Sequence, residues 1–305
     1  MEDRKVSLGD RDTQKHGAAD GAAVTKAMRR LLSGLSCLLP VLFVLPSAPA
    51  AAQEVGKPIV IGQSYRIASK IMSGERILNV WLPPDYATSG KRYPVLYLLD
   101  GGIDQDFEHI SALAQLGTIV GTTRDVIVVG IATMDRRNEL AFLPTTDAKL
   151  KADYPTAGQS ERFRDYIARE VKPWVEKRYR TDGDDGLIGE SLAGLFVIET
   201  LLRRPAMFDR YIAISPSLWW DNEALVKASG PMLAAQDSRP RWLWLSVGDE
   251  QGMGVAPFAE ILKAKAVPSL RWTYSPMPQE SHATIYHPAA LAALRALYAP
   301  PSETK

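Results

Sequence analysis

A serine in the segment 187–197 stands where it could act as a nucleophile. A short apolar stretch runs into Gly-Glu-Ser-Leu-Ala-Gly around Ser191 and then into an apolar helical pattern. Strand, sharp turn and helix around a serine are typical of a nucleophile elbow, in which the hydroxyl is lifted above a sheet. Ala193 replaces the usual glycine at the fifth position of this motif but is still small. The amide of Leu192, at the predicted helix start, would point toward a developing oxyanion. Serine is also a common helix N-cap, which is the simpler interpretation.

A nucleophilic serine needs a base, and the chain offers few candidates. In folds with such an elbow the chain order is serine, acid, histidine, so the base should follow the last strand. His16 and His109 precede the serine. His282 lies in a polar loop directly after a predicted strand at 271–276, whereas His287 begins a predicted helix. We therefore predict His282 as the general base.

The acid that would orient the imidazole is less clear from the sequence. It should follow the predicted strand at 241–247, where Gly248 is followed by Asp249 and Glu250. Either carboxylate could reach the imidazole and hold its tautomer. Both could instead be solvated turn residues. We favour Glu250 slightly, because it lies deeper in the loop.

The elements that must position these residues alternate between apolar, β-branched runs and helical patterns. This alternation predicts one α/β domain with a mostly parallel sheet covered by helices on both faces. Near-continuous apolar character marks 93–99, 125–131 and 241–247 as central strands. The other strands are predicted at 58–66, 76–82, 186–190, 210–214 and 271–276, and the helices at 104–118, 158–178, 191–204, 221–235, 256–265 and 287–298. The irregular stretch 132–157 follows a central strand, so it could contribute to a site at the carboxyl ends of the strands.

The 305-residue chain has the composition of a globular protein, with 46% hydrophobic and 23% charged residues. Its formal net charge is +1, and its lysines and arginines are spread along the chain. Nucleic-acid binding depends on concentrated positive charge, so a nucleic-acid partner is not expected. No metal or organic cofactor is implied.

Residues 1–52 form a predicted leader ahead of a catalytic domain at 53–305. Basic residues precede an apolar run at about 31–44, and small residues follow it, which is typical of a secretory signal peptide. The run is too short and too interrupted by proline for a good membrane-spanning helix. The sole cysteine, Cys37, lies inside this run. We expect a periplasmic or secreted protein without a stable membrane anchor, with either Met1 or Met28 as its true start.

These pieces together resemble the esterase D-like group of α/β-hydrolases, and in particular the periplasmic trilactone siderophore esterases. Besides the elbow, the resemblance rests on motifs in order along the chain: Tyr-Pro-Val-Leu-Tyr-Leu-Leu-Asp-Gly at 93–101, Val-Val-Gly-Ile at 128–131 followed by Arg-Arg and Pro144, Ser-Pro-Ser-Leu-Trp-Trp-Asp at 215–221, and Glu-Ser-His at 280–282. It implies an α/β-hydrolase fold without a cofactor.

The resemblance also implies roles for further residues. The amide of Gly102 would be a second oxyanion donor beside Leu192, and Trp219 and Trp220 would line the acyl or aryl pocket. Arg137, with its neighbour Arg136, would hold an anionic group of the substrate or else be solvated.

This chain departs from the pattern of the family at the position of the acid. Relatives carry an acid three residues after the strand-end glycine, where this chain has Gln251. The acid is therefore Glu250, Asp249 or absent, which would leave a Ser-His dyad.

The sequence thus predicts a serine carboxylesterase that hydrolyses a small-molecule ester, of siderophore type by resemblance, through an acyl-enzyme on Ser191. Two alternatives stay open. An acyltransferase would use the same site with an alcohol in place of water, and a non-catalytic binding protein would keep only the fold.

Overall fold

Eight strands form one continuous sheet in the computed structural model, which describes residues 56–300. The predicted leader, including its apolar run and Cys37, lies outside the described residues. The strands are β1 (Gln63–Ser69), β2 (Gly74–Trp81), β3 (Tyr93–Leu99), β4 (Ile127–Ile131), β5 (Thr181–Glu190), β6 (Arg210–Ile214), β7 (Arg241–Val247) and β8 (Leu270–Pro276). Their order across the sheet is β1-β2-β4-β3-β5-β6-β7-β8. The pairs β1–β2 and β2–β4 are antiparallel, and all others are parallel.

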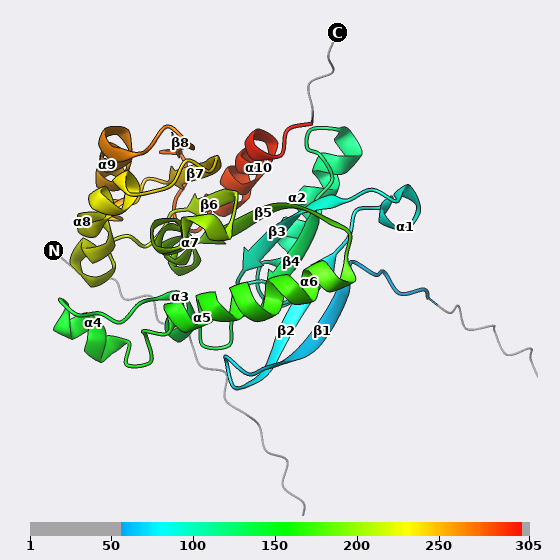
Figure 1. Ribbon diagram of the computed structural model, residues 1–305, viewed down its shortest axis with the longest axis horizontal. Helices are drawn as coiled ribbons and strands as arrows, with labels where there is room; N and C mark the ends of the chain where they lie inside the picture. The colour runs from blue at the N-terminus through cyan, green and yellow to red at the C-terminus, as the bar shows by residue number, and fades with distance from the viewer. Residues whose placement is uncertain (1–55, 301–305) are drawn as a thin grey trace, which may run out of the picture. The chain divides into compact units, whose positions relative to one another are not determined.

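The helices between the strands cover both faces of this sheet (Figure 1). They are α1 (Tyr86–Ser89), α2 (Phe107–Val120), α3 (Arg136–Leu140), α4 (Ala148–Asp153), α5 (Ser160–Tyr166), a π-helical turn (Ile167–Val171), α6 (Lys172–Arg178), α7 (Leu192–Arg203), a 3₁₀ turn (Pro205–Met207), α8 (Trp220–Ala234), α9 (Val255–Lys265) and α10 (Tyr286–Leu297). None of the helices within 56–300 is both long and apolar enough to cross a membrane.

Strand β3 shows why the sheet needs helices on both sides. All seven of its residues are buried, and side chains of successive residues point to opposite faces. Val95, Tyr97 and Leu99 pack into one hydrophobic core with α5, α7 and α8. Leu96 and Leu98 pack into a second core with α2 and α10. A strand buried on both faces reads as a continuous apolar run in the sequence, as predicted.

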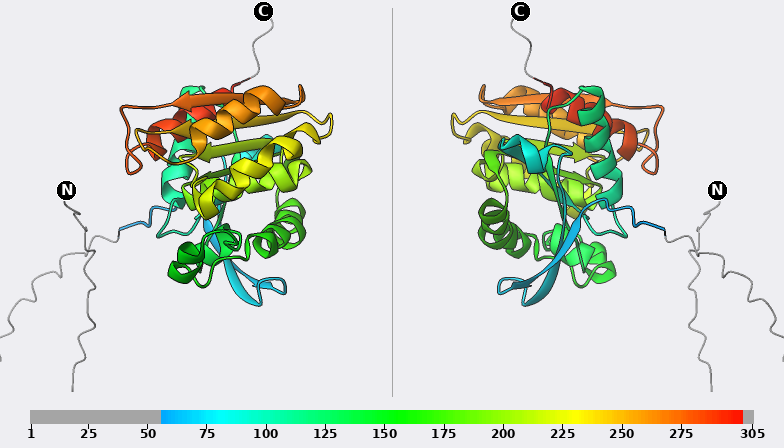
Figure 2. Two further views of the ribbon diagram at one scale, coloured as in Figure 1. Left: turned by 90° about the vertical axis from the view of Figure 1, so that its left-hand side faces the viewer. Right: turned by 90° about the vertical axis from the view of Figure 1, so that its right-hand side faces the viewer.

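The structure corrects the predicted elements mainly at their ends. The strand expected at 58–66 begins only at Gln63 and continues to Ser69, because pairing with β2 starts where Gln63 meets Val80. The helix expected at 158–178 is a helical segment in which the π-helical turn joins α5 to α6. The fold class and the strands at 93–99, 210–214 and 241–247 are confirmed. Figure 2 shows β6, β7 and β8 lying side by side, as their pairing requires.

Candidate active site

Every loop that carries a predicted site residue leaves the same edge of the sheet. Strands β3, β4, β5, β6, β7 and β8 are parallel to one another, so the loops after them gather at their shared carboxyl ends. Open α/β sheets bind ligands at this edge. The loops after β5, β7 and β8 carry Ser191, Glu250 and His282 respectively.

Ser191 lies on a sharp turn between β5 and α7. Its φ of 59° and ψ of −118° fall in a region that non-glycine residues rarely adopt, which is the strain expected of a nucleophile elbow. Its neighbours must be small. A Cβ on Gly189 would lie 2.6 Å from the Cβ of Ala193, and a Cβ on Gly194 would lie 2.9 Å from the Cα of Pro216. The close packing of the turn explains why glycine is needed at positions 189 and 194.

The amide of Leu192 is the first of helix α7. The first amides of a helix have no acceptor within the helix, and the helix dipole makes this end favourable for negative charge. The position therefore suits an oxyanion donor.

His282 and Glu250 lie against each other. The Nδ1 atom of His282 is 2.7 Å from Oε1 of Glu250, and the same oxygen accepts a 2.8 Å hydrogen bond from the hydroxyl of Ser215. Burial raises the pKa of Glu250, but the bonds from Ser215, its own backbone amide and His282 outweigh burial, so the pKa lies below its usual value. An ionised carboxylate at Nδ1 keeps the proton there and leaves Nε2 as an acceptor.

The loop path explains why Glu250, and not its neighbours, meets the histidine. The backbone amide of Asp249 donates to the carbonyl oxygen of Glu280, which ties the loop after β7 to the loop that carries His282. Glu250 then folds back over Gly248, where a Cβ would lie 2.4 Å from Oε2 of Glu250. Asp249 and Gln251 are exposed.

Ser191 and His282 are not hydrogen bonded within the part of the chain that the structure describes. The hydroxyl of Ser191 instead lies 3.3 Å from the hydroxyl of Ser217, which is buried. Catalytic hydrogen bonds are often long in substrate-free enzymes and tighten when substrate binds. Sequence reasoning missed the roles of Ser215 and Ser217, although two serines directly after the buried strand β6 point to this edge.

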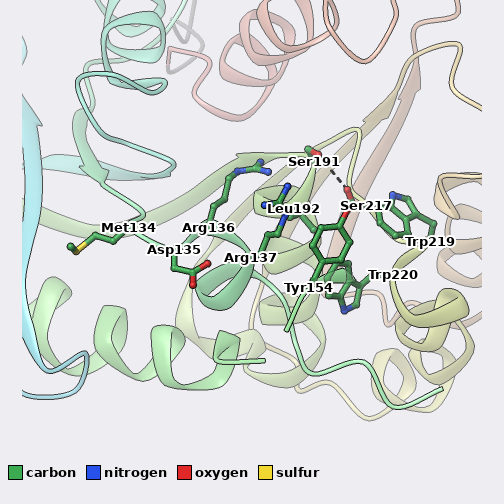
Figure 3. A pocket seen from close by; sticks show the side chains of 10 residues that line it. All are labelled: Met134, Asp135, Arg136, Arg137, Tyr154, Ser191, Leu192, Ser217, Trp219 and Trp220. Atoms are coloured by element: carbon green, nitrogen blue, oxygen red, sulfur yellow. Dashed lines mark hydrogen bonds between the residues drawn. The ribbon is translucent and has the colours of Figure 1, made fainter. Parts of the chain in front are cut away.

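A cavity of about 580 Å³ opens beside Ser191. Figure 3 shows Arg136 and Arg137 on one side of it, Trp219 and Trp220 on the other, and Tyr154 between them. The guanidinium of Arg137 lies 4.8 Å from the centre of the Tyr154 ring. The irregular stretch after β4 therefore contributes to the cavity, as predicted.

The two tryptophans differ in how they contribute. Trp220 is only 1% exposed, and its indole nitrogen donates to the carbonyl of Phe142, so most of this side chain is core. Trp219 is only partly buried. Both tryptophans thus line the cavity, as predicted, and Trp220 in addition supports Trp219 through a ring contact at 5.8 Å.

The cavity walls are fixed by buried polar contacts. Arg76 and Glu139 form a buried ion pair at 2.7 Å that anchors α3 and its two arginines. At the start of α8, Asp221 accepts hydrogen bonds from the amides of Thr145, Thr146 and Asp147. Burial raises the pKa of Asp221, but these bonds outweigh it and lower the pKa to about 2. The aromatic wall is therefore tied to the loop before α4.

Gly102 does not present a free amide. Its N–H donates a 2.8 Å hydrogen bond to Oε1 of Gln105. The structure thus differs from the expectation that this amide stands open for an oxyanion, because a side chain three residues further on already accepts from it.

Acidic side chains lie behind the elbow. Burial and the nearby charge of Asp106 raise the pKa of Glu190 to about 7, and burial and Asp100 raise that of Asp106 to about 6. The Oε1 atom of Glu190 is buried without a hydrogen-bond partner among the described residues. Within 56–300, no group of three or more His, Cys, Asp or Glu side chains is arranged to hold a metal ion.

The raised pKa of Glu190 predicts a pH-dependent stability. Between the ordinary carboxyl pKa and about 7, the unfolded chain is ionised while folded Glu190 keeps its proton, so stability falls as pH rises through this window. We expect Glu190→Gln to leave the melting temperature unchanged relative to wild type at about pH 4 and to raise it above pH 7. Thermal melts of both proteins from pH 4 to 9 test this. A difference that is constant with pH would contradict the shift.

An eight-stranded, mostly parallel sheet with helices on both faces and a serine on a strained strand-to-helix turn defines an α/β-hydrolase. The Esterase family model, described as "Putative esterase", matches residues 69–283, which is more than half of the chain. The chain belongs to this family.

Individual relatives are similar to this chain over part of their length. Ferri-bacillibactin esterase BesA of Bacillus subtilis is 30% identical over 172 residues, which cover 52% of this chain and 60% of BesA. A siderophore enterobactin esterase of Emericella nidulans is 38% identical over 208 residues, covering 59% of this chain and 63% of that protein. The alignments thus span less than two thirds of either relative.

Solved structures agree on the fold. An IroE-like serine hydrolase from Shewanella oneidensis superposes with a TM-score of 0.70 at 29% identity, covering 78% of this chain and 80% of that one. The BES protein of Bacillus cereus superposes with a TM-score of 0.71 at 22% identity, covering 81% of this chain and all of the other.

Proposed function

We propose that this protein is a carboxylic ester hydrolase that works through an acyl-enzyme on Ser191. The observation that carries the proposal is that a serine on a strained turn and a carboxylate-bound histidine stand on loops that leave the same edge of the sheet. Family membership supports it.

In the proposed reaction, the Oγ atom of Ser191 attacks the ester carbonyl while Nε2 of His282 takes its proton. Glu250 holds the tautomer and stabilises the imidazolium that forms. The amide of Leu192 holds the oxyanion, joined by the amide of Gly102 once this N–H leaves the side chain of Gln105. The tetrahedral intermediate collapses as His282 protonates the leaving alcohol. Water then repeats the sequence and releases the acid.

We propose that the substrate is a siderophore-type ester with an aromatic, anionic acyl part. Two of the relatives are named for siderophore esters. The cavity supports this class, because Tyr154 and Trp219 provide flat apolar surface and Arg136 and Arg137 provide positive charge beside it. Arg136 already binds Asp100 at 2.7 Å. The charge of Arg137 is the more available of the two.

Arg137→Gln should therefore weaken the binding of negatively charged substrates more than that of neutral ones. We expect KM for an anionic aromatic ester to rise about tenfold with little change in kcat, because one charged hydrogen bond contributes about 1.5 kcal/mol. A neutral ester of the same size serves as the matched control and should change less than about twofold. Equal effects on both esters would exclude a charge-recognition role.

The proposal is tested by a hydrolysis screen of purified residues 53–305 across p-nitrophenyl acyl esters and catecholate trilactones, together with fluorophosphonate labelling. Labelling at Ser191 with ester turnover supports it. Neither labelling nor turnover would favour a binding protein that keeps only the fold. Transfer of the acyl group to an added alcohol in preference to water would favour an acyltransferase.

We further propose that the chain acts outside the cytoplasm, as its leader predicts, with a mature N-terminus near Gln53. The basic and apolar pattern of the leader supports this.

A further inference from the structure

The amide of Gly102 is engaged before any substrate arrives. Its N–H donates to Oε1 of Gln105 at 2.8 Å, and the backbone amide of Gln105 donates back to the carbonyl of Gly102 at 3.1 Å. The side chain also packs against the glycine, since a Cβ there would lie 2.8 Å from the same Oε1 atom. A peptide N–H that already donates one good hydrogen bond is not free to hold an oxyanion.

Gln105 is held from its other end as well. Its Nε2 atom donates to the hydroxyl of Thr133 at 3.0 Å and to the carbonyl of Thr133 at 3.2 Å. Thr133 is buried in the loop two residues after the neighbouring strand β4. Both ends of the glutamine amide are thus used, which fixes the side chain between two loops at the carboxyl edge.

The contacts continue from Thr133 to the nucleophile elbow. The hydroxyl of Thr133 donates to Oδ1 of Asp100, and Nε of Arg136 donates to the other oxygen of Asp100 at 2.7 Å. Nη2 of Arg136 then donates to the carbonyl of Glu190 at 3.3 Å. Glu190 directly precedes Ser191, so a continuous chain of hydrogen bonds runs from Gln105 to the elbow.

The loop that carries Gly102 is also held at the two residues before it. Asp100 has a φ of 49°, and a Cβ on Gly101 would lie 2.3 Å from the Cα of Gly130. Buried Asn79 donates to the carbonyl of Gly101 at 2.8 Å. The Gly101 carbonyl and the Gly102 N–H belong to one planar peptide unit, so Asn79 holds the carbonyl end of this unit and Gln105 holds its N–H end.

We propose that Gln105 is a positioning residue of the oxyanion hole, which holds the Gly102 amide at rest and releases it to the oxyanion. The proposal rests on the proposed function, because it needs Gly102 to be an oxyanion donor. Release is favourable because a hydrogen bond to a charged oxygen is roughly twice as strong as one to a neutral amide oxygen. At rest, the glutamine spares the buried amide from lacking an acceptor.

Gln105→Met tests the proposal, because methionine has nearly the same length but its thioether is only a weak acceptor for the Gly102 N–H and cannot donate to Thr133. Loss of a whole oxyanion donor lowers kcat about 10²- to 10³-fold, so a mispositioned donor should lower kcat about tenfold. We expect KM to change less than about twofold and the affinity for an alkyl boronic acid, which mimics the tetrahedral state, to fall by the same factor as kcat/KM.

A second substitution, Gln105→Glu, keeps an acceptor but places a negative charge beside the forming oxyanion. We expect it to lower kcat about 100-fold at neutral pH and to recover part of this loss at lower pH, where the new carboxyl is protonated. A merely structural role of Gln105 would not produce such a pH-dependent recovery.

Matched variants separate positioning from folding. Gln115→Met makes the same change at an exposed site on α2 and should leave kcat at the wild-type value. Thr133→Val removes the hydroxyl that accepts from Gln105 and should lower kcat as Gln105→Met does. The double variant should have a kcat no lower than either single variant, because both substitutions break the same chain of hydrogen bonds.

Each outcome decides a separate point. Wild-type kcat and boronate affinity in Gln105→Met would overturn the positioning role, as would a lowered melting temperature with unchanged boronate affinity. Absence of esterase turnover and of Ser191 labelling in the wild-type protein would overturn the proposed function itself, and with it this role.

Discussion

Ser191→Ala should lower kcat for ester hydrolysis by about 10⁴-fold or more, because no acyl-enzyme can form without the hydroxyl. The fold should be unaffected. Alanine occupies the same backbone conformation at φ 59° with the same strain as serine, and only a 3.3 Å contact with Ser217 is lost. We expect the melting temperature to stay within about 2 °C of wild type. Steady-state kinetics with one activated ester and a thermal melt measure both.

The same substitution at an exposed serine serves as the control. Ser238 lies in the turn before β7, at the opposite edge of the sheet from the site. Ser238→Ala should keep wild-type kcat and full fluorophosphonate labelling, whereas Ser191→Ala should lose both. Substantial turnover or labelling in Ser191→Ala would move the nucleophile elsewhere.

The core of the sheet could be predicted from sequence because burial leaves a strong pattern. Strands β3, β6 and β7 lie inside the sheet, so every position favours an apolar residue and the run is bounded by polar turns. The exposed ends of strands show a weaker pattern, even for a strand inside the sheet. Strand β5 begins at Thr181 and not at 186, because its exposed first half is polar and carries no apolar alternation.

The candidate site shows a similar division. The positions of Ser191 and His282 follow from chain order and local context, since each loop offers one serviceable residue. Adjacent residues with similar chemistry could not be separated in this way. Whether Asp249 or Glu250 meets the histidine depends on a bond between two loops distant in sequence, and the difference between Trp219 and Trp220 depends on which ring faces the core.

The partner of Gly102 could not be predicted for a related reason. A glutamine three residues after a glycine does not by itself predict a hydrogen bond between the two. The two ends of this side chain are held only when β4 brings Thr133 beside it. Contacts of this kind depend on the sheet order, which places β4 next to β3 although the two strands are separated along the chain by α2.

Glu250→Gln should lower kcat about 10³- to 10⁴-fold while the protein stays folded. The carboxylate now accepts from both Ser215 and His282, and its pKa lies below the usual value, so it is charged throughout the working pH range. A neutral amide would lose the charge that stabilises the imidazolium and could present its NH₂ group to Nδ1, which would favour the wrong tautomer. Kinetics of the purified variant with one activated ester give the measurement.

Asp249→Asn is the matched control, because it makes the same carboxylate-to-amide change one residue away. Asp249 is exposed and contacts the histidine loop through its backbone amide, which asparagine keeps. We expect its kcat to stay within about threefold of wild type, since surface substitutions away from specific contacts have small effects. The reverse ranking of the two variants would assign the acid to Asp249. If both substitutions lower kcat by less than about tenfold, the protein works as a Ser-His dyad, and the Glu250 contact would then serve only to hold the two loops together.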